Sequence, residues 1–186
     1  MRILACADLH GQPDRIALVR RLADRHSPDV VLLPGDLTHA GHGEEALELL
    51  QSLPMRVLAI PGNMDGPRAA AGIAERGSLL GPEMVVIDGI SFGGPNAAGP
   101  CDVLVVHEPP LGTLDRVTSG KHIGSGSVRE MVTRFTPRVL TCGHVHESPG
   151  IERLGETLIV NCTMGDGKTG GALIEITLER VDAKLL

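Results

Sequence analysis

The first sixty residues alternate between short apolar runs and segments with helical periodicity. The apolar runs are typical of buried strands and cover residues 3–7, 30–33 and 55–60. The helical segments place their apolar side chains on one face and cover residues 13–26 and 44–53. Pro13 suits the first turn of the earlier helix. This strand–helix–strand order predicts right-handed crossovers and a mainly parallel sheet.

The second half of the chain is richer in strand patterns. Asp88-Gly89 separates two apolar runs, residues 85–87 and 90–92, which is a strong hairpin signal. A second hairpin is expected to pair residues 151–154 with 157–160. Further buried strands are predicted at 103–106, 139–142, 158–160 and 173–178. A helix is expected at about 127–135, where Ser127 followed by Glu130 suits a capping box.

These elements predict a single α/β domain over residues 1–186, with two sheets faced by helices. The sequence contains no internal repeat and no linker long enough to separate two domains. Residues 107–126 show little periodicity, and loops of this length are usually functional or disordered.

Composition narrows the classes of function. The chain has two Phe and no Trp or Tyr, so a base-stacking platform for single-stranded nucleic acid is not expected. A formal net charge of −6 argues against broad electrostatic binding to nucleic acid or anionic membranes. No apolar run approaches the ~18 residues of a membrane span and no signal peptide is recognised, so a cytoplasmic location is expected. The cysteines lack zinc-finger spacing, and we expect Cys6 and Cys142 to be buried and apolar.

Polar residues that can bind metal follow five of the apolar strands. They are Asp8 and His10, Asp36, Asn63 and Asp65, His107 and Glu108, and His144 and His146. Each has an ordinary structural explanation on its own, because Asp can cap a turn or helix, Asn tolerates a left-handed turn and His is common on surfaces. Ligands of open α/β folds bind outside the carboxyl ends of the strands, however, so five such coincidences favour one shared site.

The motifs D-x-H, G-D, G-N, H-E-P-P and G-H-x-H occur in this order between Asp8 and His146. Together they resemble the calcineurin-like metallophosphoesterase superfamily. With the segment G-K-H-I-G-S, the pattern is most similar to the small prokaryotic phosphoesterases of that superfamily. The resemblance implies a four-layer α/β/β/α sandwich of two mixed sheets flanked by helices, in agreement with the two sheets predicted above.

The resemblance also implies a dinuclear metal centre. One ion would be held by Asp8, His10 and His146, the other by Asn63, His107 and His144, and Asp36 would bridge them. These ligand types suit two divalent ions, with Mn²⁺ expected first and Fe²⁺, Zn²⁺ or Ni²⁺ as alternatives. Two divalent ions against two Asp leave a positive site that attracts phosphate. We expect direct attack by a metal-bridging hydroxide, without a phospho-enzyme.

Met64 departs from the family pattern. Many members read G-N-H-D or G-N-H-E here, and that His is thought to protonate the leaving group, whereas a thioether donates no proton. Acid assistance typically contributes ~10²–10⁴-fold and matters most for poor leaving groups. Small relatives with G-N-x-D tend towards phosphodiesterase activity, so a phosphodiester is the favoured substrate. Asp65 would then only cap the turn.

His122 is the first candidate to replace the missing acid, and an ordinary exposed loop His is the alternative. The backbone of Gly124 and Ser125, which follow it, could donate N–H groups to a phosphate. The expected catalytic residues are Asp36, Asn63, His107 and His122, and the expected substrate contacts are Asn63, His122, Gly124 and Ser125. His39 and His42 could line the cleft, whereas His26 is expected to be structural.

Residues 165–169, G-D-G-K-T, resemble a phosphate-binding loop, but a strand follows instead of a helix, so a turn is predicted. The expected substrate is a small phosphodiester or nucleotide-like molecule. Neither a membrane nor a stable nucleic-acid complex is expected, and a homodimer is a further expectation because these small enzymes often pair. Two alternatives stay open: a phosphomonoesterase or nucleotide phosphatase, and a non-catalytic scaffold on the same fold, like the retromer subunit.

Overall fold

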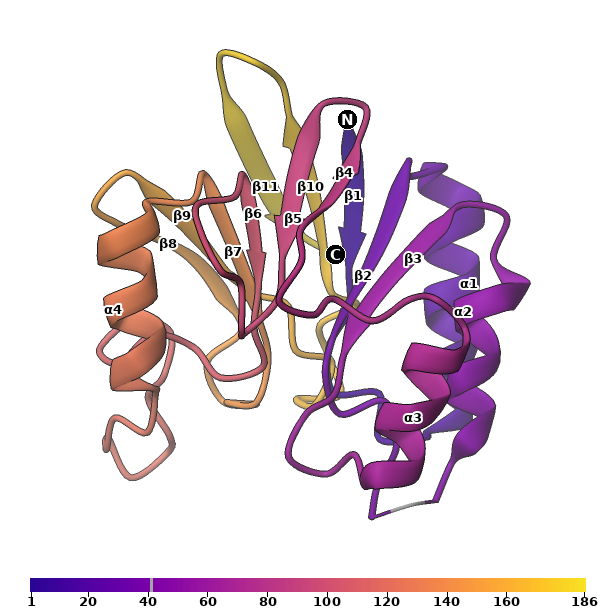
Figure 1. Ribbon diagram of the computed structural model, residues 1–186. Coiled ribbons are helices and arrows are strands. Elements are labelled where there is room, and N and C mark those ends of the chain that lie inside the picture. The colour runs from indigo at the N-terminus through magenta and orange to yellow at the C-terminus, as the bar shows by residue number, and fades with distance from the viewer. Residues whose placement is uncertain (41) are drawn as a thin grey trace.

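Two sheets packed face to face form the centre of the protein, and helices cover both outer faces (Figure 1). The computed structural model describes residues 1–40 and 42–186. Within these ranges one sheet has five strands in the order β11-β10-β1-β2-β3, and the other has six in the order β4-β5-β6-β7-β9-β8. Helices α1, α2 and α3 lie outside the first sheet and α4 lies outside the second. The predicted four-layer α/β/β/α sandwich is confirmed.

The first sheet is mixed. It contains β1 (Arg2–Ala5), β2 (Val30–Pro34), β3 (Arg56–Ile60), β10 (Ala172–Ile176) and β11 (Val181–Leu185). Strands β1, β2 and β3 are parallel, whereas β10 and β11 are antiparallel to their neighbours. The helices on its outer face are α1 (Pro13–His26), the 3₁₀ turn η1 (Glu44–Glu48), α2 (Leu49–Ser52) and α3 (Pro67–Glu75). The parallel part is the strand–helix–strand series that the first sixty residues predict.

The second sheet is also mixed, with two antiparallel hairpins at its edges. Its strands are β4 (Val85–Ile87), β5 (Ile90–Gly93), β6 (Val103–Val105), β7 (Val139–Cys142), β8 (Gly150–Leu154) and β9 (Thr157–Asn161). The predicted hairpins are confirmed, because β4 pairs with β5 and β8 pairs with β9 in antiparallel register. Helix α4 (Gly126–Phe135) follows the long loop after β6.

Three apolar clusters fill the spaces between the four layers. One lies between the sheets and includes Ile3, Leu32 and Phe92. Another lies under α1 and includes Leu4 and Val19. Ile3 and Leu4 belong to different clusters because successive residues of a strand point to opposite faces of the sheet. The third lies between α4 and the second sheet. The core is therefore aliphatic, as expected for a chain with two Phe and no Trp or Tyr.

Three details differ from the sequence predictions. Helix α4 is capped by Ser125, whose Oγ accepts a hydrogen bond from the Val128 N–H, so the predicted cap at Ser127 is wrong. The predicted helix at 44–53 begins as the 3₁₀ turn η1 and becomes α-helical only at Leu49. The sequence predictions do not include helix α3, which buries Ala69 and Ile73 on one face, or edge strand β11, whose five residues alternate between apolar and polar.

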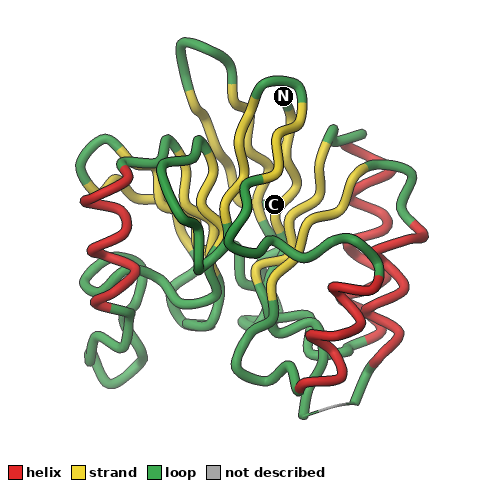
Figure 2. Tube along the Cα trace, in the orientation of Figure 1, coloured by secondary structure: helices red, strands yellow, loops and turns green. Residues whose placement is uncertain are grey.

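The loops that follow the parallel strands lie at one edge of the two sheets, below the strands in Figure 2, and other connections lie above them. Residues 165–169 form a turn before β10, as predicted, and the Asp166 carboxylate accepts hydrogen bonds from the backbone of Lys168 and Thr169. Cys6 and Cys142 are fully buried, and burial raises the pKa of Cys6 to about 12. No helix in the described ranges is long and apolar enough to cross a membrane.

Candidate metal centre

Five loops bring the predicted ligands together at the carboxyl ends of β1, β2, β3, β6 and β7. Backbone hydrogen bonds fasten the loops of the first sheet to each other, since the His10 N–H donates to the Asp36 carbonyl at 2.8 Å. In the second sheet the Gly143 N–H donates to the His107 carbonyl at 2.9 Å. The two sheets are joined where the His144 N–H donates to the Asp8 carboxylate at 3.0 Å.

Two groups of ligand atoms are compact enough to hold a cation. In one group, the ligand atoms of Asp8, His10 and His146 all lie within 4.8 Å of one another. The Nε2 atoms of His10 and His146 are 3.3 Å apart, and Asp8 Oδ1 lies 3.5 Å from His146 Nε2. These are the three residues assigned above to the first ion.

The second predicted set also converges. Asn63 Oδ1 lies 2.9 Å from His107 Nε2 and 2.9 Å from His144 Nδ1. Asp36 Oδ2 lies 3.4 Å from His107 Nε2 and 3.9 Å from His10 Nε2, so it stands between the two sets. The second compact group consists of Asp8, Asp36 and His107. All seven predicted ligands therefore belong to one cluster.

The atoms of this cluster fit a divalent cation chemically. The Nδ1–H of His107 donates to the Pro34 carbonyl at 2.9 Å, which leaves Nε2 of the neutral ring with a lone pair facing Asn63 Oδ1. With the Asn63 amide in this orientation, a proton on Nε2 or a metal ion near both atoms would relieve the repulsion between the two lone pairs. Such a hydrogen bond on the distal nitrogen is the usual way in which proteins orient a metal-binding imidazole.

The pKa shifts of both carboxylates and of two imidazoles in the cluster suit a cation. Burial raises the pKa of Asp8, but the hydrogen bond from His146 and the charge of His107 lower it below the ordinary value. Burial also raises the pKa of Asp36, but the hydrogen bond and charge of His107 together with the Met64 N–H lower it below the ordinary value. Burial lowers the pKa of His10 and His144, so both rings keep a free nitrogen at neutral pH.

The backbone is strained at this cluster. Asp8, His10, Asp36 and His144 have φ of 63°, 49°, 53° and 67°. Left-handed conformations are uncommon for residues other than Gly, and each costs on the order of 1–3 kcal/mol. Glycines make room for the ligands, because a Cβ at Gly35 would lie 2.6 Å from His107 Nδ1. A Cβ at Gly62 would overlap the Asp36 carboxylate.

A cavity of about 430 Å³, here named the metal cavity, opens beside the cluster. Besides five of the predicted ligands it is lined by Gln12, Arg15, His39 and Met64. His39 lines the cleft, as predicted, and its Nδ1 lies 3.5 Å from Nδ1 of His10, whereas His42 is not among the residues that line this cavity. Met64 lines the cavity, and its N–H donates to Asp36 Oδ1 at 2.8 Å.

Two residues have roles that the sequence did not reveal. The Asp65 carboxylate accepts hydrogen bonds from the N–H groups of Leu37, Thr38 and Gly62, so it ties the loop after β2 to the loop after β3. Arg15 Nη1 donates to the Asp8 carbonyl at 2.7 Å and brings a positive charge to the metal cavity. Asp65 does more than cap its turn.

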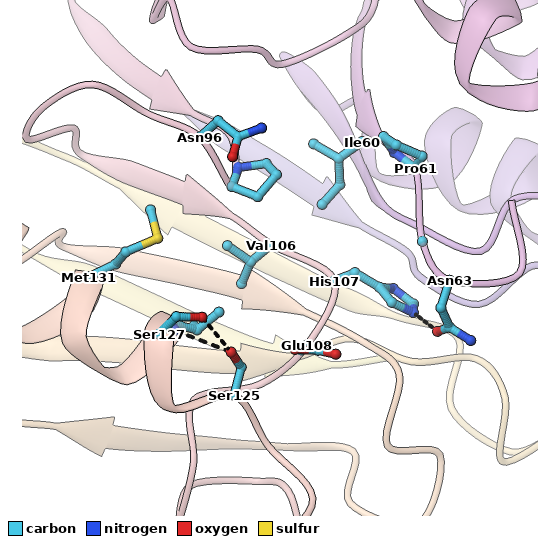
Figure 3. Close-up of a pocket in the computed structure, with 13 residues that line it drawn as sticks. Ile60, Pro61, Asn63, Asn96, Val106, His107, Glu108, Ser125, Ser127 and Met131 are labelled. Atoms are coloured by element: carbon cyan, nitrogen blue, oxygen red, sulfur yellow. Dashed lines mark hydrogen bonds between the residues drawn. The ribbon is translucent and has the colours of Figure 1, made fainter. Parts of the chain in front are cut away.

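The long loop holds the remaining predicted residues. His122 Nδ1 lies 2.5 Å from Asp115 Oδ1, and neither the metal cavity nor the cavity of Figure 3 has His122 among its lining residues. The Gly124 N–H donates to Asp115 Oδ2 at 3.0 Å and is therefore occupied. Ser125 lines the cavity of Figure 3, which also contains Asn63 and His107.

Comparisons with known proteins agree with this geometry. The sequence model described as calcineurin-like phosphoesterase matches residues 1–148. An uncharacterized protein of Methanocaldococcus jannaschii is 31% identical over 195 residues, covering 87% of this chain and 87% of that protein. These matches extend over most of the chain.

Solved structures of similar fold include proteins of different kinds. A novel archaeal phosphodiesterase has a TM-score of 0.67 and 18% identity, with 100% of each chain covered. GAP50, the anchor in the inner membrane complex of Plasmodium, has a TM-score of 0.67 and 11% identity, covering 100% of this chain and 84% of its own. Similarity at this level of identity shows the fold alone. The match over residues 1–148 shows more: the chain belongs to the calcineurin-like phosphoesterase family.

Proposed function

We propose that the protein hydrolyses phosphodiesters with the help of two divalent ions, Mn²⁺ being the first candidate. The observation that supports this most strongly is the convergence of two carboxylates, four imidazoles and one amide oxygen, with Asp36 between the two sets. When bound, two such ions would acidify a water molecule and polarise the phosphate ester.

The chain itself would contribute orientation and charge. Asp8, His10 and His146 would hold one ion, and Asn63, His107 and His144 the other. Arg15 adds a guanidinium at the metal cavity, where it favours an anionic substrate. Asp36 is fixed by the Met64 N–H and is almost fully buried, so its carboxylate has little freedom to move.

Preference for a diester is supported by Met64. Met64 lines the metal cavity, at the sequence position where an acid is common in the family, and a thioether cannot protonate a leaving oxygen. The absent acid matters least for esters with good leaving groups. A phosphomonoesterase or nucleotide phosphatase is the second candidate, because His39 lines the same cavity and carries a ring that can donate a proton.

Hydrolysis of bis-p-nitrophenyl phosphate against p-nitrophenyl phosphate tests the proposal. Metal-stripped protein would be resupplied in turn with Mn²⁺, Fe²⁺, Zn²⁺ or Ni²⁺, and bound metal would be counted by elemental analysis. Asp36→Asn should abolish hydrolysis, whereas Asp182→Asn, on exposed edge strand β11, should behave as the parent. Monoester preference would favour the second candidate. Binding of two ions without hydrolysis of either ester would refute a catalytic role and favour a scaffold.

A further inference from the structure

A second cavity lies beside the metal cluster, on the side of Asn63 and His107 (Figure 3). Its volume is about 370 Å³, within the range of roughly 300–1,000 Å³ that is usual for small-molecule sites. We name it the substituent cavity. It shares Asn63 with the metal cavity, so a molecule attached to a phosphate on the ions can reach it.

The walls of the substituent cavity are mostly apolar. Ile60 ends β3 and Pro61 follows it, Val106 follows β6 and Met131 projects from α4, so both sheets and one helix contribute. Figure 3 shows Met131 on the far side of the cavity from His107 and Asn63. An organic group that extends away from the cluster would therefore lie against aliphatic side chains, where burial of apolar surface is favourable.

A few polar groups interrupt this surface. Ser127 Oγ lies 2.8 Å from Ser125 Oγ, which also caps α4, and the dashed lines of Figure 3 mark this contact. The Asn96 side chain makes no hydrogen bond to the described residues and lies at the exposed rim. An amide and a hydroxyl at opposite walls can pair with hydroxyl, amide or imide groups of an occupant.

Charge decides which occupants fit. Glu108 is the acidic residue of the lining, and none of the described residues that line the cavity is Lys or Arg. A second phosphate or a carboxylate placed beside Glu108 would meet a like charge, and no Lys or Arg among the described lining residues would pair with it. A neutral or cationic group meets no such penalty.

We propose that the substituent cavity binds one ester group of the phosphodiester, namely a neutral, nucleoside-sized group with hydrogen-bonding polar atoms. This inference rests on the proposed function and extends it to the class of substrate. A phosphate monoester that is bound through its phosphate and directs its one organic group elsewhere leaves the cavity empty. Binding in the cavity thus adds to the diester preference that Met64 suggests, because energy from remote contacts lowers the barrier at the reacting centre.

Two non-chromogenic diesters test the cavity as inhibitors of bis-p-nitrophenyl phosphate hydrolysis. Thymidine 5′-(methyl phosphate) carries a nucleoside, and dimethyl phosphate presents the same charged centre without one. We expect the nucleoside diester to inhibit at least tenfold more strongly. Met131→Trp should bring the ratio of the two inhibition constants close to one by filling the cavity. Met84→Trp is the matched control, since Met84 is 41% exposed and outside the cavity, and it should keep the ratio.

Glu108→Gln tests the charge argument separately. It should strengthen inhibition by methyl 2-carboxyethyl phosphate at least threefold relative to thymidine 5′-(methyl phosphate). An unchanged ratio in both Met131→Trp and Glu108→Gln would overturn the inference, even if the protein hydrolyses diesters.

A binding measurement separates this inference from the proposed function. In Zn²⁺-loaded protein with methyl-¹³C methionine, thymidine 5′-(methyl phosphate) should shift the Met131 methyl resonance and leave that of Met84 in place. A Met131 shift without any hydrolysis would refute the proposed function and retain the cavity as a binding site. Hydrolysis without a Met131 shift would refute the cavity assignment alone.

Discussion

Asp65→Asn is expected to weaken metal binding without touching a metal ligand. The carboxylate holds the loop that carries Asp36 against the loop that carries Asn63. Its Oδ2 accepts from the N–H groups of Leu37 at 3.1 Å and Gly62 at 3.0 Å, and its Oδ1 accepts from the N–H and Oγ of Thr38 at 2.8 Å. An asparagine keeps the shape of the side chain but has one acceptor oxygen instead of two.

The magnitude follows from which contact is lost. The least costly orientation turns the new NH₂ towards Thr38, because the hydroxyl can rotate to accept while the Thr38 N–H cannot. One hydrogen bond to a charged acceptor then disappears, and it is worth about 1.5–3 kcal/mol. We expect the free energy of unfolding to fall by about 2–3 kcal/mol and Mn²⁺ affinity to fall about 10–100-fold, as for other groups that orient metal ligands.

Calorimetric titration with Mn²⁺ measures the affinity, and urea unfolding followed by circular dichroism measures the stability, since the chain has no Trp or Tyr to report by fluorescence. Asp102→Asn is the matched control. Its Oδ2 accepts from the N–H and Oγ of Ser91 at 2.9 and 2.6 Å, at the amino end of β6 away from the ligands. It should lose stability but keep metal affinity. Equal metal affinity in both variants would refute the reasoning.

Three further changes have clear expected outcomes. Gly62→Ala should abolish binding of the second Mn²⁺ in a calorimetric titration, because its Cβ would overlap the adjacent carboxylate, whereas Gly66→Ala, with open space around it, should bind normally. Arg15→Gln should raise KM for a diester about tenfold by removing a charge from the metal cavity, and an unchanged KM would show that the arginine only braces the backbone. Burial raises the pKa of Asp115, but the hydrogen bonds from His122 and from two backbone N–H groups lower it overall. The carboxylate therefore stabilises the fold fully above its ordinary pKa of about 3.9, and this stabilisation is lost as the pH falls through the lower pKa of the folded state. Asp115→Asn should therefore reduce the unfolding free energy at pH 7 and flatten its decline below about pH 4, as measured by circular dichroism, and a parallel decline in both proteins would contradict this.

The strands and ligand positions that the sequence predicts correctly are marked by short patterns of neighbouring residues. Apolar runs mark the buried strands, and a ligand that directly follows a strand is placed by the strand itself. Asp65 and Arg15 lacked such signals, because the partners of Asp65 in the β2 loop lie 27 and 28 residues away and Arg15 also reaches the Gly165 carbonyl 150 residues along the chain. Contacts of this kind exist only once the sheets have assembled.

The start of α4 shows how tertiary contacts select between equal local signals. Ser125 and Ser127 both offer a capping hydroxyl, and the sequence favours the second because Glu130 stands three residues after it. In the structure the Ser125 N–H donates to the Pro109 carbonyl and its carbonyl accepts from the Leu111 N–H. This pairing with the long loop fixes Ser125 in extended backbone, so the helix begins at the next residue. Strand β11 has an alternating pattern of only five residues, and in the structure it pairs with β10 over all five.

Fold similarity alone does not separate a hydrolase from an anchor, because a phosphodiesterase and GAP50 have the same TM-score to this chain. The free-energy cost of burying the cluster's charged side chains in left-handed backbone is more informative. Asp8 is fully buried and Asp36 is 2% exposed, and both are charged groups held in left-handed backbone. Replacing a buried charged set with packed apolar side chains is often neutral or stabilising by about 1–4 kcal/mol. A protein that served only as an anchor would gain from that replacement, so the convergence of seven candidate ligands, four of them in left-handed backbone, supports a role that needs a metal.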